Sequence, residues 1–291
     1  MNVIKLKKEN GLIESLAKRG IVHELQFTSN TTTVIANNTK YIIAENFLSF
    51  KELGFVSKVK KYAQRSGFEE MPISASDINY FKYSPSIFTE DKIYFDVVEL
   101  DANQAYWEIA KSIGYISEEI YLEGLKVDKA TRLIALGSMA TNKRRFLFDP
   151  LKNEYEDLED IVNPVTRSYF FHIAKELDLL MSEFCEKHNW EGIYFYWVDA
   201  FFISNLMAKL LIDFFAENGL EVKEKRIKSM KVKRTRTGHK ITILDAPDLQ
   251  KGFSDIEIEE RTFQCIDIKK KRKQMVSSFL RRIEKLINDQ K

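Results

Sequence analysis

Two acidic residues, Asp101 and Asp199, each lie at or near the end of an apolar, aromatic run that is typical of a buried strand. The runs are Lys92–Leu100 and Ile193–Ile203. A carboxylate in such a place is costly to desolvate unless a cation compensates it. Side-by-side pairing of the two strands would bring the carboxylates together, and a divalent metal ion is the usual remedy for their repulsion. The pair therefore predicts metal-assisted phosphoryl transfer.

Elements expected from periodicity and turn residues alternate along the chain. Expected strands are Ile21–Thr28, Thr32–Ala36, Lys40–Ala44, Lys92–Leu100, Arg145–Phe148, Ile193–Ile203 (with a tight turn near Asp199), Leu220–Lys225, Lys228–Arg234 and Lys240–Leu244. Expected helices are 7–19, Phe50–Ser66, Gln104–Ile113, Glu118–Glu123, Lys129–Asn142, Pro164–Lys187 (capped by Asn163), Asn205–Asn218 and Val276–Asp289. This order predicts an α+β fold in which helices cover one face of a mainly antiparallel sheet.

Three further segments complete the pattern. Asn37-Asn-Thr39 is typical of a hairpin turn. Residues 68–92 are loop-like, and the acidic segment Asn153–Asp160 is expected to be exposed.

Around these aspartates the chain resembles the family B DNA polymerases, and in particular their protein-primed phage and plasmid type. Asp101-Ala-Asn-Gln-Ala-Tyr106 resembles motif A, and Phe195-Tyr-Trp-Val-Asp-Ala200 stands where the family has motif C. Residues 129–141 stand where motif B belongs, and Lys228–Arg234 resembles the strand with the primer-contact motif. The order of the motifs is preserved over roughly residues 90–240.

The resemblance implies a template-directed DNA polymerase built on a compact palm with an antiparallel sheet covered by helices, without an exonuclease domain. It implies three regions: an N-terminal α/β region at 1–90, a palm-like core with motifs A, B and C at 91–245, and a basic, helical C-terminal appendage at 246–291. The implied partners are a DNA template and primer, a deoxynucleoside triphosphate and a priming or replication protein.

Roles for individual residues also follow from the resemblance. Asp101 and Asp199 would hold two Mg²⁺ or Mn²⁺ ions, and Tyr106 would stack under the sugar and exclude a 2′-OH. A cationic residue on the motif B helix, Lys129 or Arg132, would neutralise the triphosphate. Phosphate contacts to the primer backbone would come from Lys231, Lys233 and Arg234.

Departures from the family pattern keep other interpretations open. Trp197 replaces the first aspartate of motif C, and Leu133 stands at the expected lysine of motif B. A second interpretation is therefore a catalytically degenerate polymerase descendant that binds nucleic acid or a replication partner. The third is a purely structural or interaction protein whose palm-like pattern is coincidental. Asp101 then caps the helix beginning near Gln104, and Asp199 is an ordinary turn residue.

Composition sets the remaining limits. The chain has 291 residues with 44% hydrophobic residues, enough for a substantial core, and its net charge of +2 argues neither for nor against nucleic acid. Residues 223–240 and the run Lys269–Lys273 are rich in Lys and Arg, which fits a phosphate-tracking surface or simply solvated faces.

The two cysteines, Cys185 and Cys265, lie far apart and lack the spacing of a zinc site or a disulfide framework. No run approaches the roughly 18 apolar residues of a membrane span. We therefore expect no membrane association and a cytoplasmic protein, in the host cytoplasm if the chain is viral.

Overall fold

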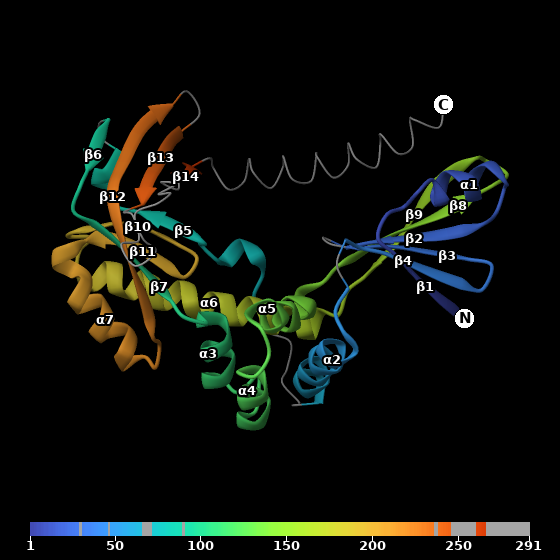
Figure 1. Cartoon of the computed structure of the whole chain (residues 1–291), viewed down its shortest axis with the longest axis horizontal. Coiled ribbons are helices and arrows are strands. Elements are labelled where there is room, and N and C mark those ends of the chain that lie inside the picture. The colour runs from blue at the N-terminus through green and yellow to red at the C-terminus, as the bar shows by residue number, and fades with distance from the viewer. Residues whose placement is uncertain are drawn as a thin grey trace, which may run out of the picture. The chain divides into compact units, whose positions relative to one another are not determined.

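The computed structural model describes residues 1–28, 31–45, 47–65, 72–88, 91–235, 238–245 and 260–265. The chain divides into two units (Figure 1). Unit 1 comprises Met1–Ala75 and Ile109–Ala174, and unit 2 comprises Ser76–Glu108 and Lys175–Lys291. Each unit thus uses two separate stretches of chain, whereas the divisions expected at residues 90 and 245 follow the chain in order. The expected helix Val276–Asp289 and the run Lys269–Lys273 lie outside the described residues.

Unit 1 contains a six-stranded sheet in the order β1-β4-β3-β2-β8-β9. Its strands are β1 (Asn2–Leu6), β2 (His23–Phe27), β3 (Thr32–Ala36), β4 (Thr39–Ile43), β8 (Lys143–Asp149) and β9 (Glu154–Ile161). β1 and β4 are parallel, and the other neighbours are antiparallel. Its helices are α1 (Leu12–Lys18), α2 (Phe50–Arg65), α4 (Glu118–Gly124) and α5 (Lys129–Gly137), with the 3₁₀ turn η3 (Ser138–Ala140) after α5.

Local sequence explains several of these elements. Asn37 and Asn38 both have positive φ, 47° and 59°, which is the backbone that a two-residue hairpin turn requires between β3 and β4. The predicted turn is confirmed. The acidic segment expected to be exposed is mostly so, but it forms the edge strand β9, which pairs with β8. Charged side chains on an edge strand discourage pairing with another chain.

Unit 2 contains an antiparallel sheet in the order β14-β13-β12-β7-β11-β10-β5, with β6 paired to β12. Its strands are β5 (Phe81–Tyr83), β6 (Lys92–Tyr94), β7 (Val97–Ala102), β10 (Ile193–Trp197), β11 (Ala200–Ser204), β12 (Val222–Thr235), β13 (Gly238–Asp245) and β14 (Glu260–Cys265). The helix α7 (Ala208–Glu217) and the 3₁₀ turns η1 (Ala75–Asp77), η2 (Pro85–Phe88) and η4 (Asn205–Met207) complete the described elements, η1 beginning at the unit boundary.

Two helices cross the boundary between the units, α3 (Ala105–Ser112) and α6 (Pro164–Lys187). The start of α6 follows from its sequence: Asn163 Oδ1 accepts the backbone N–H of Thr166 at 3.1 Å, and proline suits the first helical position. The predicted bounds and cap of α6 are confirmed. Among the described residues, no helix is long and apolar enough to cross a membrane.

The central strands of unit 2 follow the connection order strand, helix, strand, strand, helix, strand, through β7, α6, β10, β11, α7 and β12. In space these strands lie in the order β12-β7-β11-β10, so β7 and β10 run parallel with β11 between them. This is the split βαβ topology. The expected strand Ile193–Ile203 is a hairpin of two strands, and the strands expected at Leu220–Lys225 and Lys228–Arg234 form one long strand, β12.

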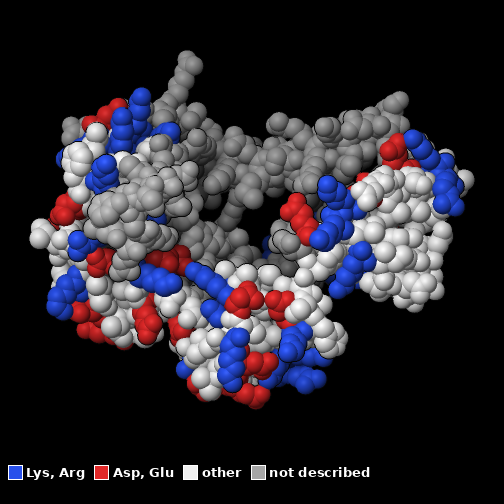
Figure 2. Space-filling model, viewed as in Figure 1, with Lys and Arg blue, Asp and Glu red and all other residues white. Residues whose placement is uncertain are grey.

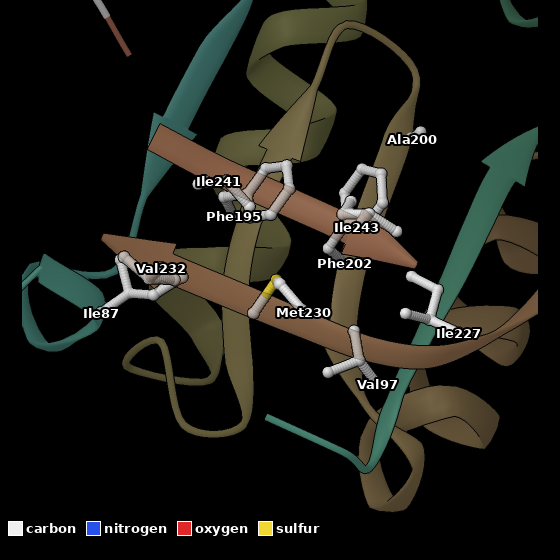
Figure 3. Packing of buried hydrophobic residues seen from close by; sticks show 10 residues of the cluster. All are labelled: Ile87, Val97, Phe195, Ala200, Phe202, Ile227, Met230, Val232, Ile241 and Ile243. Carbon is white, nitrogen blue, oxygen red and sulfur yellow. The ribbon is translucent and has the colours of Figure 1, made fainter. Parts of the chain in front are cut away.

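Both faces of this sheet are packed. On one face, the ring of Phe184 on α6 packs against two others. Its centroid lies 5.5 Å from that of Phe201 on β11 and 5.2 Å from that of Phe214 on α7. The opposite face holds a core cluster (Figure 3), made of Ile87, Val97, Phe195, Ala200, Phe202, Ile227, Met230, Val232, Ile241 and Ile243. Burial on both faces explains why residues 193–203 are almost continuously apolar. The chain is a mixed α+β protein with mainly antiparallel sheets, as its sequence predicts.

Candidate active site

The two predicted aspartates lie on neighbouring strands of unit 2. Asp101, near the end of β7, pairs in register with Ala200, the first residue of β11. One step further, the backbone N–H of Ala102 donates to the carbonyl oxygen of Asp199 at 2.9 Å. The pairing expected from the sequence is therefore confirmed at the level of the backbone.

Asp199 occupies the turn that joins β10 to β11. The preceding residue, Val198, has a left-handed backbone with φ of 58°. That conformation costs a β-branched residue about 1–3 kcal/mol and persists only where its surroundings hold it. The backbone N–H of Val198 donates to the carbonyl of Tyr80 at 2.7 Å. The turn that carries Asp199 is thus fixed from outside the hairpin.

Tyr106 is the second residue of α3. Before the helix, Gln104 has a φ of 57°, and its backbone carbonyl accepts the N–H of Trp107 at 2.7 Å. Gln104 therefore occupies the position before the helix that the structural interpretation gave to Asp101, which lies inside β7. Burial raises the pKa of the Tyr106 hydroxyl, and the charges of Tyr80 and Asp199 raise it further. Tyr106 and Asp199 are thus near enough to interact electrostatically.

Side chains alternate between the two faces along a strand, so every second residue of β7 lies on the same face as Asp101. On β7 this face also carries Glu99, which is buried. Asp101 lies opposite Lys223 of β12, and Glu99 lies opposite Lys225. Both lysines are exposed. A pair of cations therefore runs beside the acidic strand.

The lysines that the sequence singled out on β12 lie on its other face. The register of β12 shifts between Ile227 and Ser229, and the residues beyond it that join the core cluster are Met230 and Val232. Lys231 and Lys233 alternate with these two, are exposed, and so face away from the side that carries Asp101. The side chain of Arg234 lies outside the described residues.

Charge on the visible surface does not gather in one place. Across the described residues of the face in Figure 2, basic and acidic side chains are interspersed. On this face a polyanion would therefore meet small local groups of basic side chains and not one broad basic field.

The two cations predicted for the triphosphate lie on α5 and belong to unit 1, whereas Asp101, Asp199 and Tyr106 belong to unit 2. Lys129 is exposed on the first turn of α5. Arg132 Nη1 donates to the carbonyls of Gly124 at 2.9 Å and Val127 at 2.7 Å. Arg132 therefore satisfies carbonyls at the end of α4, and a contact of either residue with a nucleotide stays a prediction.

The two aspartates at the strand ends are the residues from which the sequence predicts a metal site. Mg²⁺ is commonly held by one or two carboxylates together with substrate phosphates. Within the described ranges, no group of three or more His, Cys, Asp or Glu side chains could hold a metal ion. A metal ion at Asp101 and Asp199 would therefore need further ligands from a bound phosphate or water, and its binding stays a prediction.

Several residues at this site have no distinctive signal in the sequence. Tyr80, which accepts the Val198 N–H, comes from a segment that looks like a loop, and Lys223 is one of many basic residues in its run. Only strand pairing shows their proximity to the aspartates. Comparison of the chain with protein-family models, with curated proteins and with solved structures finds no match.

Proposed function

We propose that this protein is a template-directed DNA polymerase-like nucleotidyltransferase that acts at Asp101 and Asp199. One observation carries the proposal: in a split βαβ sheet, Asp101 is near the end of the first strand and Asp199 is in the hairpin turn beside it. Enzymatic phosphoryl transfer depends almost entirely on positioning and on charge stabilisation. Two carboxylates at adjacent strand ends, with one sheet face covered by helices, are the arrangement expected of a polymerase palm.

The proposed roles of the residues combine their positions with what the resemblance implies. Asp101 and Asp199 would hold Mg²⁺ or Mn²⁺, and such an ion would supply acidification of the primer hydroxyl and neutralisation of phosphate charge. Burial moves the pKa of the Tyr106 phenol further above its ordinary value, so the phenol stays protonated over a wide pH range. By the resemblance, its ring would lie under the incoming sugar. Lys223, exposed opposite Asp101, contacts a backbone phosphate of the primer–template DNA. A priming or replication protein remains a proposed partner.

A second candidate function is a catalytically degenerate descendant that only binds nucleic acid or a replication partner. The observation that favours it is Trp197, where the resembled family has a motif C aspartate. The indole lies 5.2 Å from the ring of Phe81, so its position is filled by aromatic packing. Arg132 also favours the second candidate, because its Nη1 already donates hydrogen bonds to two backbone carbonyls instead of being reserved for a nucleotide.

Primer extension on a templated DNA duplex with Mg²⁺ or Mn²⁺ tests the proposal. We expect extension by the wild type and a loss of more than about a hundredfold in Asp101→Ala and in Asp199→Ala, since even outer-shell partners of a metal are worth about 10–100-fold. Asp213→Ala is the matched control, because Asp213 makes an exposed ion pair with Lys209 on α7. No extension by folded wild type with either metal contradicts the proposal. Salt-dependent DNA binding that survives both substitutions would then support the second candidate.

A further inference from the structure

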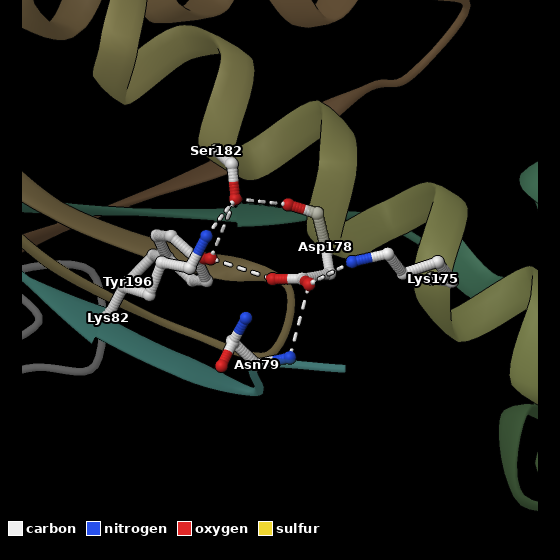
Figure 4. Close-up of polar contacts among 6 residues, drawn as sticks. All are labelled: Asn79, Lys82, Lys175, Asp178, Ser182 and Tyr196. Carbon is white, nitrogen blue, oxygen red and sulfur yellow. Dashed lines mark hydrogen bonds and ion pairs between the residues drawn. The ribbon is translucent and has the colours of Figure 1, made fainter. Parts of the chain in front are cut away.

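Asp178 is a buried carboxylate on α6, only 3% exposed. Its Oδ1 accepts the Tyr196 hydroxyl at 2.8 Å, and its Oδ2 accepts the backbone N–H of Asn79 at 3.1 Å and the Lys175 ammonium at 3.3 Å (Figure 4). A buried charge is tolerated only where such donors compensate it. Two of these donors come from outside α6, one from β10 and one from the segment before β5.

The same part of α6 holds that segment at a second point. Lys82 Nζ donates to Ser182 Oγ at 2.6 Å, and Ser182 Oγ in turn donates to the backbone carbonyl of Asp178 at 2.7 Å. Ser182 Oγ also lies 3.2 Å from the Tyr196 hydroxyl. Residues 79–82 are thus bonded to α6 at both ends, at Asn79 through Asp178 and at Lys82 through Ser182 (Figure 4).

Between these two points lies Tyr80, whose carbonyl accepts the N–H of Val198 at 2.7 Å. Val198 is the left-handed residue immediately before Asp199. A strained residue needs neighbours that hold it. Asp178 is therefore connected to the turn that carries Asp199 by a hydrogen bond to Asn79, the peptide bond to Tyr80 and the hydrogen bond from Val198.

We propose that Asp178 is a positioning residue, which fixes residues 79–82 on α6 and thereby holds the hairpin turn so that Asp199 lies beside Asp101. The catalytic consequence rests on the function proposed above. The structural part does not, because it concerns hydrogen bonds within unit 2.

Amide hydrogen exchange at Val198 tests this inference directly. In Asp178→Ala we expect exchange of the Val198 amide to accelerate on the order of tenfold to a hundredfold, as follows from losing a hydrogen bond to a charged group. Amides in the pairing of β7 with β11 should keep their relative protection. Asp178→Asn retains an oxygen that accepts the Asn79 N–H, and we expect it to restore Val198 protection. Asp213→Ala is the control and should leave Val198 unchanged.

Val198 exchange that stays within about threefold of wild type in a folded Asp178→Ala variant overturns the proposal, as does equal loss in the alanine and asparagine variants. Should Asp178→Ala fail to fold, native-state exchange of the wild type decides the question. The amides of Asn79 and Val198 are then expected to open together, with one denaturant dependence. Separate opening of the two amides contradicts the proposal.

Primer extension adds the catalytic readout. Asp178→Ala is expected to lower kcat with little change in the KM for nucleotide, because Asp178 lies behind the site and not at the substrate. Wild type that extends no primer contradicts the proposed function alone, since Val198 exchange still tests the positioning role. Normal kcat in Asp178→Ala, with faster Val198 exchange, would overturn the catalytic part of the inference.

Discussion

The backbone of Ala102 donates a hydrogen bond of 2.9 Å to the carbonyl of Asp199, which sets the turn of one hairpin against the end of another strand. Asp101 precedes Ala102 directly, so the two carboxylates belong to residues one register step apart. Under the proposed function the two carboxylates would share a bound cation, which would offset the repulsion between them. The relationship leads to a test that needs no substrate.

Magnesium or manganese is expected to stabilise the wild type against unfolding. A metal ion at a hundred times its Kd adds about 2.7 kcal/mol when it binds only the folded state. In Asp101→Asn or Asp199→Asn this metal-dependent gain should largely vanish, while stability without metal should hold or rise as repulsion is removed. Thermal unfolding with and without EDTA measures both. A metal-dependent gain that persists in both variants would place the metal elsewhere.

The proximity of Tyr106 and Asp199 predicts a coupled titration. Burial, the charge of Tyr80 and the charge of Asp199 together hold the pKa of Tyr106 above its ordinary value. Asp199→Asn removes one cause, so the pKa of Tyr106 should move down while burial keeps it raised. NMR of ring-labelled tyrosine measures this, with Tyr106→Phe assigning the signal. An unchanged pKa in Asp199→Asn would mean that the two groups do not interact.

The two faces of β12 predict different contributions to DNA binding. Removing one lysine that binds a phosphate of duplex DNA reduces the slope of log K against log salt by about 0.9. We expect that reduction in Lys223→Ala, because Lys223 lies opposite Asp101. Lys231→Ala is the matched control on the other face and should leave the slope unchanged. The reverse result would show that DNA lies against the face of Lys231, as the resemblance alone suggested.

His23 in unit 1 predicts a pH-dependent stability. It is 1% exposed, with Nδ1 2.8 Å from the carbonyl of Ile21 and Nε2 2.8 Å from the Tyr155 hydroxyl. Burial lowers its pKa below 6.5, although the hydrogen bond to Ile21 opposes this. The unfolded chain therefore binds a proton first as the pH falls, and stability declines from about pH 6.5 down through the folded-state pKa.

Urea unfolding between pH 5 and 7.5 measures this decline. His23→Gln, which keeps polar groups but does not titrate, should remove the part of the pH dependence that His23 contributes. A His23→Gln variant with the same pH dependence as the wild type would assign the decline to other groups.

The sequence by itself determined the elements whose signals are local. Asn163 and Pro164 mark the start of α6, and Asn37 with Asn38 marks the hairpin turn, because capping and positive φ depend on residues close in the chain. The apolar runs before Asp101 and around Asp199 indicated buried strands for the same reason. The mixed α+β class follows from such signals taken in order.

Tertiary structure decided what depends on pairing between distant segments. The edge strand β9 has a charged sequence and forms because β8 supplies its partner. The register of β12 puts Lys223 on the face of Asp101, while Lys231, in the same basic run, faces away. Nothing in the sequence distinguishes Asp178 from other polar residues of a long helix, because its partners Tyr196 and Asn79 reach it only in the folded structure. A strand's own sequence can indicate that it is buried, but which residues lie opposite each other depends on a second strand far away in the chain.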